Sequence, residues 1–438
     1  MASSRRDPAV RAAVEQGLLT PAEPVVALID ADGVRASAAA LDTAFAAIAP
    51  GARIMHAFAV KACPLVPVLR LLYEAGLGAE VASPGELALA RAAGVPASRT
   101  VLDSPAKTAG ELREALTLGI ALNADNFQEL ALLDALVART ARFPRVGLRV
   151  NPQLGSGAIG ALSTAAPTSK FGVALRDPGA REEVVRAYLD RRWLTRLHVH
   201  SGSQGIPLAL MAEGVAELYG LAEEINAKAG RTQVDTLDIG GGLPVNFASD
   251  EESPTYAEYA RLLAERVPGL YDGRYALVTE FGRSLLARHG TVLARVEYTK
   301  TAGGRAVAVT HAGVQLATRT VYDPEAYPVR IAAYDAEGRP RTGPEVAQDV
   351  AGPACFAGDL LAAARPLPRL EPGDVAAVLD TGAYYFSSHY GYNSLPRPAV
   401  HGFTRTADGI RFALVRRAQS LAEIVAESGG EDPDALLR

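Results

Sequence analysis

Lys61 is the residue of this sequence that is best placed for covalent chemistry. It stands in an otherwise apolar stretch, Ala59-Val60-Lys61-Ala62, at the end of a run that is typical of a strand. Loss of hydration there favours the uncharged amine, which is nucleophilic and can form a Schiff base with a carbonyl group. A lysine at a strand end is also a common surface residue, so Lys61 alone does not decide between the two interpretations.

Three other segments carry polar groups that could surround a small charged ligand. They are H-S-G-S at 200–203, the glycine triplet at 240–242 and E-F-G-R at 280–283. The backbone N–H groups of a glycine loop can hold a phosphate. A glycine triplet is a weak signal by itself, but the three segments together indicate a site for a phosphate-bearing aromatic cofactor.

Each of these segments follows a short apolar run, and such runs alternate with helical periodicity between Arg53 and Arg283. The expected strands are Ile54–Val60, Gly78–Ala82, Thr100–Asp103, Ala121–Ala124, Val146–Val150, Leu197–Val199, Thr236–Ile239 and Ala276–Thr279. Eight units over about 230 residues favour an α/β fold with a closed (β/α)8 barrel over a doubly wound open sheet. In a barrel the carboxyl ends of all strands share one rim, so the polar segments are expected to meet there.

The pattern changes after the eighth unit. Runs rich in β-branched residues occur at 290–298 and 305–310, with Pro- and Gly-rich breaks between later runs. Residues 23–30 are also typical of a strand, one that can pair with this second unit. We therefore predict a barrel over residues 30–285 and an all-β domain, a barrel or sandwich, formed by residues 1–29 and 286–438.

The composition excludes several classes of protein. A net charge of -5 over 438 residues, with 49% hydrophobic and 21% charged residues, argues against a nucleic-acid partner. No apolar run approaches the length of about 18 residues that spans a bilayer, so we expect no membrane association and a cytoplasmic location. Two cysteines, Cys63 and Cys355, allow no disulfide framework and no metal-ligand spacing, so no metal site is expected.

The motifs resemble the fold-type III pyridoxal-phosphate (PLP) decarboxylases, the ornithine/diaminopimelate decarboxylase family. To the segments above, this resemblance adds G-P-A-C at 352–355 and G-A-Y at 382–384, and it runs in the family's order from about Val25 to Ala399. It implies an alanine racemase-like barrel followed by a C-terminal β domain. It also implies a carboxy-lyase that acts on a small amino acid and uses pyridoxal 5'-phosphate.

The resemblance further implies roles for individual residues. Lys61 would hold the cofactor as a Schiff base, His200 would stack on its pyridine ring, and Glu280 would pair with the ring nitrogen, with Glu80 nearby. A carboxylate beside the ring nitrogen strengthens the cofactor as an electron sink. The residues that resemble the phosphate-binding set are Ser203, Gly240, Gly241, Gly242, Gly282 and Tyr384.

Cys355 resembles the family cysteine that reaches the active site of the partner subunit and controls protonation at Cα. A homodimer with shared active sites is therefore implied. A free cysteine is more often a small buried hydrophobe, and only the G-P-A-C context favours the catalytic interpretation.

The substrate pocket departs from the family pattern. By the resemblance, Ala312 and Phe356 occupy positions that often carry acidic residues in diamine-forming relatives, which argues against a distal cation and so against lysine, ornithine and diaminopimelate. Arg283 and Arg319, with Tyr322 one residue out of register, resemble a clamp on a distal carboxylate. An acidic, amide, apolar or carrier-linked amino acid is therefore expected.

Three assignments and three alternatives stay open. Arg283 could serve the phosphate or the substrate, Tyr384 could serve both, and the Gly-, Ser- and Ala-rich segment 154–169 is either a lid or surface slack. The alternatives are diaminopimelate decarboxylase proper, a PLP-dependent racemase or epimerase, and a regulatory homologue without activity. The G-P-A-C motif argues against the second, and intact Lys61 and Glu280 argue against the third.

Overall fold

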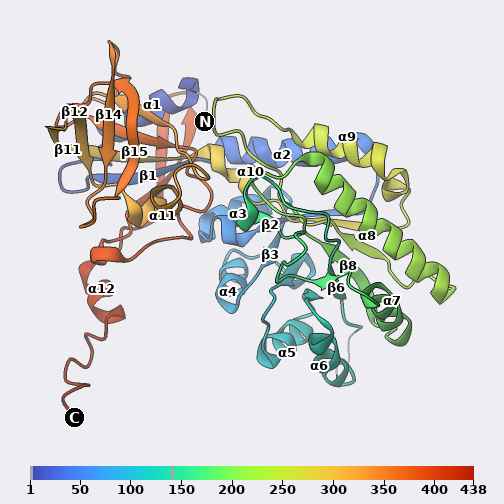
Figure 1. The fold of residues 1–438 in the computed structure, drawn as a ribbon. Coiled ribbons are helices and arrows are strands. Elements are labelled where there is room, and N and C mark those ends of the chain that lie inside the picture. Colours follow the sequence, from blue (N-terminus) through green and yellow to red (C-terminus); the bar gives the residue numbers. More distant parts are fainter. Residues whose placement is uncertain (1–2, 140–142) are drawn as a thin grey trace. The chain divides into compact units, whose positions relative to one another are not determined.

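The computed structural model describes residues 3–139 and 143–438, which divide into two compact units (Figure 1). The barrel unit consists of Arg35–Asn246 and Glu251–Leu285. The β unit consists of Met1–Val34, Phe247–Asp250 and Leu286–Arg438.

The barrel unit contains a closed ring of eight parallel strands, as the sequence predicts. The strands in chain order are β2 (Ile54–Ala59), β3 (Gly78–Val81), β4 (Thr100–Asp103), β5 (Ala121–Ala124), β6 (Val146–Asn151), β8 (Leu194–Val199), β9 (Thr236–Asp238) and β10 (Ala276–Thr279). The ring closes because β10 pairs with β2, and β5 pairs with β6. The short strand β7 (Val173–Ala174) is added beside β6.

Helices surround the barrel strands (Figure 1). They are α2 (Ala31–Ile48), α3 (Val66–Glu74), α4 (Pro84–Ala92), α5 (Ala109–Leu118), α6 (Phe127–Val137), α7 (Ala180–Asp190), α8 (Leu208–Ala229), α9 (Tyr256–Arg266) and the short α10 (Arg283–Leu286). Local sequence sets several of their boundaries. In α5 the side chains of Thr108 and Glu111 form a reciprocal capping box, and the helix ends at Gly119 with a left-handed backbone.

The barrel strands are buried on both faces, and for that reason they appear in the sequence as continuous apolar runs rather than alternating ones. The parallel arrangement places the carboxyl ends of all eight at one rim. The loops after β2, β8, β9 and β10 carry the polar segments identified in the sequence. The fold therefore brings together residues that are more than 200 positions apart in the chain.

The β unit is built mainly from strands. They are β1 (Val25–Asp30), β11 (Gly290–Ala302), β12 (Arg305–Thr310), β13 (Ile331–Tyr334), β14 (Glu345–Ala351), β15 (Leu360–Pro368), β16 (Val375–Leu379), β17 (Ala399–Thr406) and β18 (Gly409–Arg416). Along the sheet the order is β15-β14-β12-β11-β1-β17-β18, and β16 pairs with β11 and β13. The early strand β1 thus lies between two strands of the C-terminal region, as residues 23–30 suggested.

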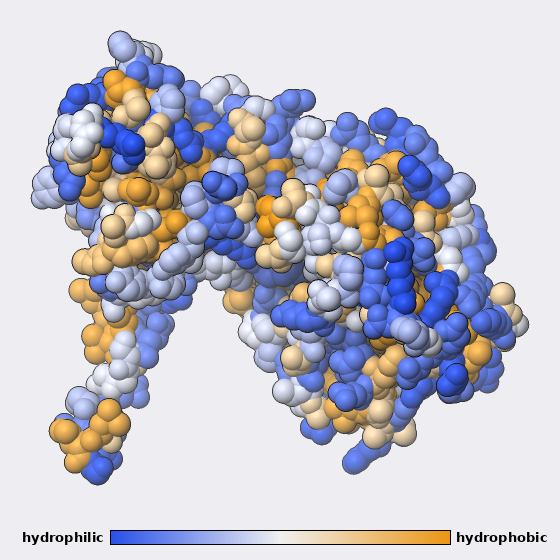
Figure 2. Space-filling model, in the orientation of Figure 1, coloured by the Kyte–Doolittle hydropathy of each residue, from blue (hydrophilic) through white to orange (hydrophobic). Residues whose placement is uncertain are grey.

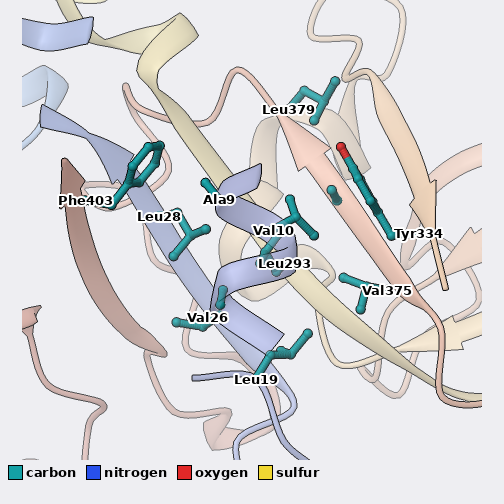
Figure 3. Close-up of a cluster of buried hydrophobic side chains, with 12 residues drawn as sticks. Ala9, Val10, Leu19, Val26, Leu28, Leu293, Tyr334, Val375, Leu379 and Phe403 are labelled. Carbon is teal, nitrogen blue, oxygen red and sulfur yellow. The ribbon is translucent and has the colours of Figure 1, made fainter. Parts of the chain in front are cut away.

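The β unit is not entirely β, because it also contains α1 (Ser3–Glu15), α11 (Val314–Tyr322) and α12 (Leu421–Glu427). The sequence analysis did not identify these helices. Helix α1 packs Ala9 and Val10 against Leu28 and Leu293 of the sheet, in the cluster shown in Figure 3. Burial of this apolar face holds a helix whose own sequence has little amphipathic pattern.

Exposed apolar residues concentrate at the C-terminal end of the chain. Leu436 and Leu437 are 97% and 81% exposed. Figure 2 shows hydrophobic residues in orange near this end of the chain. Within residues 3–139 and 143–438, no helix is both long and apolar enough to cross a membrane.

Candidate active site

Lys61 lies in a short 3-10 turn, Val60–Ala62, directly after β2. Its amine donates a hydrogen bond to Oε2 of Glu80 on β3, with 2.5 Å between the two atoms. Glu80 is buried, whereas 44% of the Lys61 side chain is exposed. Burial raises the pKa of Glu80, and the charge of Lys61 opposes that shift. The pair places an accessible amine at the rim beside a carboxyl group that can exchange a proton with it.

His200 lies in the loop after β8 and is fixed by the glycine triplet. Its Nδ1 accepts a hydrogen bond from the backbone N–H of Gly241 at 3.1 Å, so the proton of the neutral ring is on Nε2. Burial, with further contributions from the charges of Arg149 and Lys61, lowers the pKa of His200 well below its ordinary value. The ring is therefore neutral, which suits stacking against another aromatic ring.

The segment 154–169 holds the His200 loop in place. Backbone N–H groups of Ala165 and Ser203 donate hydrogen bonds across the two loops, to the carbonyl oxygens of Ser201 (3.2 Å) and Leu162 (3.0 Å). The hydroxyl of Thr164 also donates to the carbonyl of His200. This segment is therefore hydrogen-bonded to the His200 loop and helps to fix it, and it is not a loose surface loop.

The glycine triplet packs so closely against neighbouring backbone that there is no room for a side chain. A Cβ on Gly241 would lie 2.0 Å from the carbonyl oxygen of Glu280, and a Cβ on Gly242 would lie 2.0 Å from that of Gly202. Gly242 also has a φ of +100°, which disfavours any other residue. The triplet can thus approach its neighbours closely and present backbone groups at the rim.

Gly242→Ala is expected to lower the free energy of unfolding by at least about 2 kcal/mol, because the new Cβ meets rigid backbone and the φ value is unfavourable. Gly220→Ala is the matched control, since a Cβ at this position in α8 meets nothing within 4 Å. That change should stabilise by up to about 1 kcal/mol through helix propensity. Chemical unfolding of both variants tests this, and equal stability of the two would contradict the packing argument.

A network of ionisable groups fills the interior of the barrel below the rim. His198 on β8 is fully enclosed, with Nδ1 3.5 Å from Oδ2 of Asp103 and Nε2 3.5 Å from Oε2 of Glu280. Arg149 on β6 donates a hydrogen bond to Asp103 at 3.3 Å. Oε1 of Glu280 is buried and has no hydrogen-bond partner among the described residues.

The network shifts the pKa values of its members in opposite directions. Burial, followed by the charges of Glu80 and Asp103, raises the pKa of Glu280 well above its ordinary value. Burial and Glu280 together raise the pKa of Asp238 to about 7. Burial would also raise the pKa of Asp103, but His198, Arg149 and nearby lysines lower it overall. Such opposed shifts are typical of functional sites.

Other predicted residues of the barrel unit lie on the same rim. Gly282 follows Glu280, and a Cβ there would lie 3.0 Å from the Cβ of Ala62, so this glycine lets the Glu280 segment pack on the Lys61 turn. Arg283 begins α10 and is buried. Ser203 lies in the loop after β8.

The remaining predicted residues belong to the β unit. Cys355 is exposed, and its backbone N–H donates to Oδ1 of Asn393 at 2.7 Å. The guanidinium of Arg319 lies over the rings of Tyr384 and Tyr327, 5.0 Å and 5.5 Å from their centroids. That these residues form one active site with the barrel residues stays a prediction.

Phe356 and Tyr322 form one side of a four-ring cluster in the β unit. Their rings are stacked at 5.9 Å, and Tyr390 and Tyr392 are stacked at 6.0 Å. Edge contacts of 5.9 Å and 5.7 Å join the two pairs. The hydroxyl of Tyr322 donates to that of Tyr390 at 3.2 Å, and 59% of Tyr322 is exposed. We call these four residues the aromatic cluster.

The sequence analysis assigned no role to several residues that the structure places at the site. Asp103, Arg149, His198 and Asp238 all lie within or at the ends of buried barrel strands. The usable signal was a charged or imidazole side chain inside an apolar strand, as in V-G-L-R-V-N and L-T-R-L-H-V. Such residues are rarely buried without a partner or a function.

The barrel residues fit a phosphate-bearing pyridine aldehyde. An accessible amine is present at Lys61, and the glycine triplet forms a cradle that any Cβ would fill. The orphaned buried oxygen of Glu280 is suited to a protonated ring nitrogen.

Comparison with known proteins places this arrangement in a wider group. Diaminopimelate decarboxylase of Pseudomonas aeruginosa is 33% identical over 371 residues, 84% of this chain and 85% of the relative. That of Aquifex aeolicus is 31% identical over 343 residues, 78% and 79% of the two chains. The crystal structure of the Helicobacter pylori enzyme with L-lysine matches with a TM-score of 0.82, 25% identity and coverage of 95% of this chain and 100% of that one.

A family model described as "Pyridoxal-dependent decarboxylase, pyridoxal binding domain" matches residues 32–287, more than half of the chain. The expected barrel with a second, mainly β unit is confirmed by the same comparisons. The motifs, the barrel rim and these matches together show that the chain belongs to the PLP-dependent decarboxylases of the ornithine/diaminopimelate family and is a carboxy-lyase with PLP as its cofactor.

Proposed function

We propose that this enzyme decarboxylates, at Cα, an amino acid whose side chain does not end in a cation. The observation that carries the proposal is Phe356, which stands beside Cys355 at a position that, by the family resemblance, often carries an acidic residue in diamine-forming relatives. Phe356 packs within the aromatic cluster. In place of a carboxylate, Phe356 offers an apolar ring that can bury an apolar, aromatic or amide side chain but cannot form an ion pair with an ammonium group.

The carboxylate nearest in sequence to Phe356 is engaged in holding the local backbone. Asp359 is buried and accepts hydrogen bonds from the backbone N–H groups of Val314 (2.6 Å) and Ala354 (2.7 Å). A Cβ on Gly313 or Gly352 would lie within 2.5 Å of its oxygens, so both glycines make room for it. Asp359 therefore supports the shape of the Cys355 segment, and it does not supply a substitute anion for a substrate ammonium.

The barrel residues supply the chemistry common to the family. When bound, PLP provides an electron sink for the pair of electrons left on Cα as CO2 departs. We assign Lys61 as the amine that holds the cofactor and Glu80 as the carboxyl that exchanges a proton with that amine. His200 is assigned to the ring face and Glu280 to the ring nitrogen.

We assign the remaining predicted residues by the same reasoning. Ser203, the glycine triplet, Gly282 and Tyr384 are proposed for the phosphate, with backbone and hydroxyl donors. Arg319 is proposed for the distal end of the substrate, together with Arg283 and Tyr322. The guanidinium of Arg319, positioned by two ring faces, can form paired hydrogen bonds with a distal carboxylate or amide.

We also propose a homodimer in which the active sites are shared. Exposure of Cys355 and of Tyr322 and Tyr392 in the aromatic cluster supports this, because groups of exposed apolar residues mark surfaces that another molecule covers. Each copy would then contribute Cys355 to the site of the partner subunit.

Diaminopimelate decarboxylase proper is the second candidate function. Three of the most similar relatives bear that name at 31% to 33% identity, with coverage of 78% to 85%. Arg319 is compatible with the distal carboxylate of that substrate. The departures at Ala312 and Phe356 are the reasons for ranking it second.

The substrate proposal predicts the outcome of a CO2-release assay with the PLP-loaded enzyme. Acidic, amide, apolar and aromatic amino acids of both configurations are compared with lysine, ornithine and diaminopimelate. The first group should contain the substrate of highest kcat/KM, and Phe356→Glu should lower that value about tenfold or more, or about 1.4 kcal/mol in transition-state binding.

The matched control is Tyr298→Glu, because the Tyr298 ring is 67% exposed and lies outside the proposed site. Tyr298→Glu should leave kcat/KM unchanged. A preference of the unmodified enzyme for diaminopimelate would overturn the first proposal in favour of the second.

A further inference from the structure

His198 lies within the network of ionisable groups inside the barrel, and it is fully buried there. Its side chain is 0% exposed, and each ring nitrogen faces a carboxylate oxygen at 3.5 Å, Nδ1 toward Asp103 and Nε2 toward Glu280. Neither nitrogen has another hydrogen-bond partner among the described residues. The contacts with the two carboxylates therefore decide the protonation of this ring.

Counting protons limits the possible states. A neutral imidazole has a single N–H, so it can donate to only one of two ionised carboxylates. The lone pair of its other nitrogen would then face a negatively charged oxygen of the second carboxylate. Asp103 is also bound by Arg149, which favours its ionised form and so keeps the Nδ1 proton of His198 toward it. A second proton is needed between His198 and Glu280, and it lies either on Nε2 of His198 or on Oε2 of Glu280.

The charged surroundings determine which of these two states is preferred. The groups that act on His198 and Glu280 come from several strands and loops of the barrel, namely Lys61, Glu80, Asp103, Arg149, Arg196, His200 and Asp238. Burial lowers the pKa of His198 and raises that of Glu280. Without a cation beside Glu280, the proton is therefore held by Glu280.

Resting on the role proposed for Glu280, we propose that His198 is a positioning residue that takes up the proton of Glu280 when a protonated ring nitrogen occupies the barrel. The proton moves from Oε2 of Glu280 to Nε2 of His198, and no bond to carbon changes. Glu280 becomes an anion facing the ring nitrogen, and the imidazolium lies between two carboxylates. The barrel interior gains no net charge from this transfer.

The same three groups have atoms within 4.8 Å of one another, a spacing that could also suit a metal ion. Positive charge is already present beside them, because Arg149 contacts Asp103 and Lys61 contacts Glu80, and both cations act on Glu280. A further cation would be repelled by both. We therefore favour the proton over a metal at this position.

The test is a count of protons released when PLP binds to the cofactor-free protein, measured by calorimetry in buffers of different ionisation enthalpy. In the unmodified protein the proton of Glu280 stays inside the barrel. In His198→Asn it must leave to solvent, so this variant should release about one more proton per site. His311→Asn is the control, because His311 is partly exposed and pairs with Glu297 outside the barrel; its count should equal that of the unmodified protein.

A second readout is the pH dependence of kcat. Loss of the imidazole leaves Glu280 with a higher pKa, so the acidic limb of the profile should move to higher pH in His198→Asn. His198→Gln, which also lacks a group that can take up the proton, should move it in the same direction and serves if His198→Asn does not fold.

The outcomes separate the inference from the proposed function. Failure of the unmodified protein to bind PLP would contradict the role of the whole site. Normal PLP binding with equal proton counts and an unmoved acidic limb would overturn the role of His198 alone. Tight binding of Zn2+ to the cofactor-free protein, lost in His198→Asn, would also overturn it in favour of a metal site.

Discussion

Lys61→Ala is expected to abolish CO2 release, with a loss of about 1,000-fold or more, or about 4 kcal/mol in the activation barrier. The amine is the only group proposed to hold the cofactor covalently, and no other lysine lies in the Lys61 turn. The change also leaves the buried carboxylate of Glu80 without its cation, so some loss of stability is expected as well. Activity and the visible absorbance of the bound cofactor are measured together.

Lys61→Arg separates covalent chemistry from charge. The guanidinium keeps a positive charge beside Glu80 but cannot form a Schiff base, so this variant should be more stable than Lys61→Ala and equally inactive. Lys228→Ala on the surface of α8 should retain full activity, because that lysine only pairs with Glu224 one turn away. Wild-type CO2 release by either Lys61 variant would contradict the proposed role.

Mixing inactive Lys61→Ala with inactive Cys355→Ala is expected to restore activity to about a quarter of the wild-type level. If subunits exchange at random, half of the dimers are mixed, and in each mixed dimer one of the two shared sites has both residues intact. The measurement is CO2 release after the two variants are unfolded or dissociated together and reassembled.

The mixing experiment needs two controls. Each variant is carried through the same treatment alone, and the double variant Lys61→Ala, Cys355→Ala is mixed with wild-type protein. Absence of rescue, with dimers shown by light scattering, would mean that Lys61 and Cys355 act within one subunit. Monomers alone would contradict the homodimer itself.

The barrel was predictable from the sequence to a large extent. Three strands, Thr100–Asp103, Ala121–Ala124 and Ala276–Thr279, have the predicted bounds, because strands buried on both faces are continuous apolar runs with polar residues at their ends. The predicted start of β8 was three residues late, since Arg196 interrupts its apolar run. That arginine is buried in the barrel, where the charge of Asp238 on the neighbouring strand acts on it, a tertiary effect that local pattern does not contain.

The site was predictable only in part, for a related physical reason. Residues in recognisable motifs, such as Lys61 and Glu280, were identified from their type and their position after a strand. Contacts between strands were not, because the approach of His198 to Asp103 and Glu280 depends on barrel closure rather than on spacing in the chain. Helix α1 was missed because its apolar face is narrow, and the segment becomes helical through packing on the sheet.

The position of β1 has a consequence for the order of events during synthesis. This strand pairs with β11 on one side and with β17 on the other, so residues 25–30 leave the ribosome long before either neighbour exists. All residues of the barrel unit are made in between and can fold as a unit, since domains generally fold as they emerge. Until residue 406 has been made, the first strand of the nascent chain has an unpaired edge, which makes it the segment most in need of protection from aggregation.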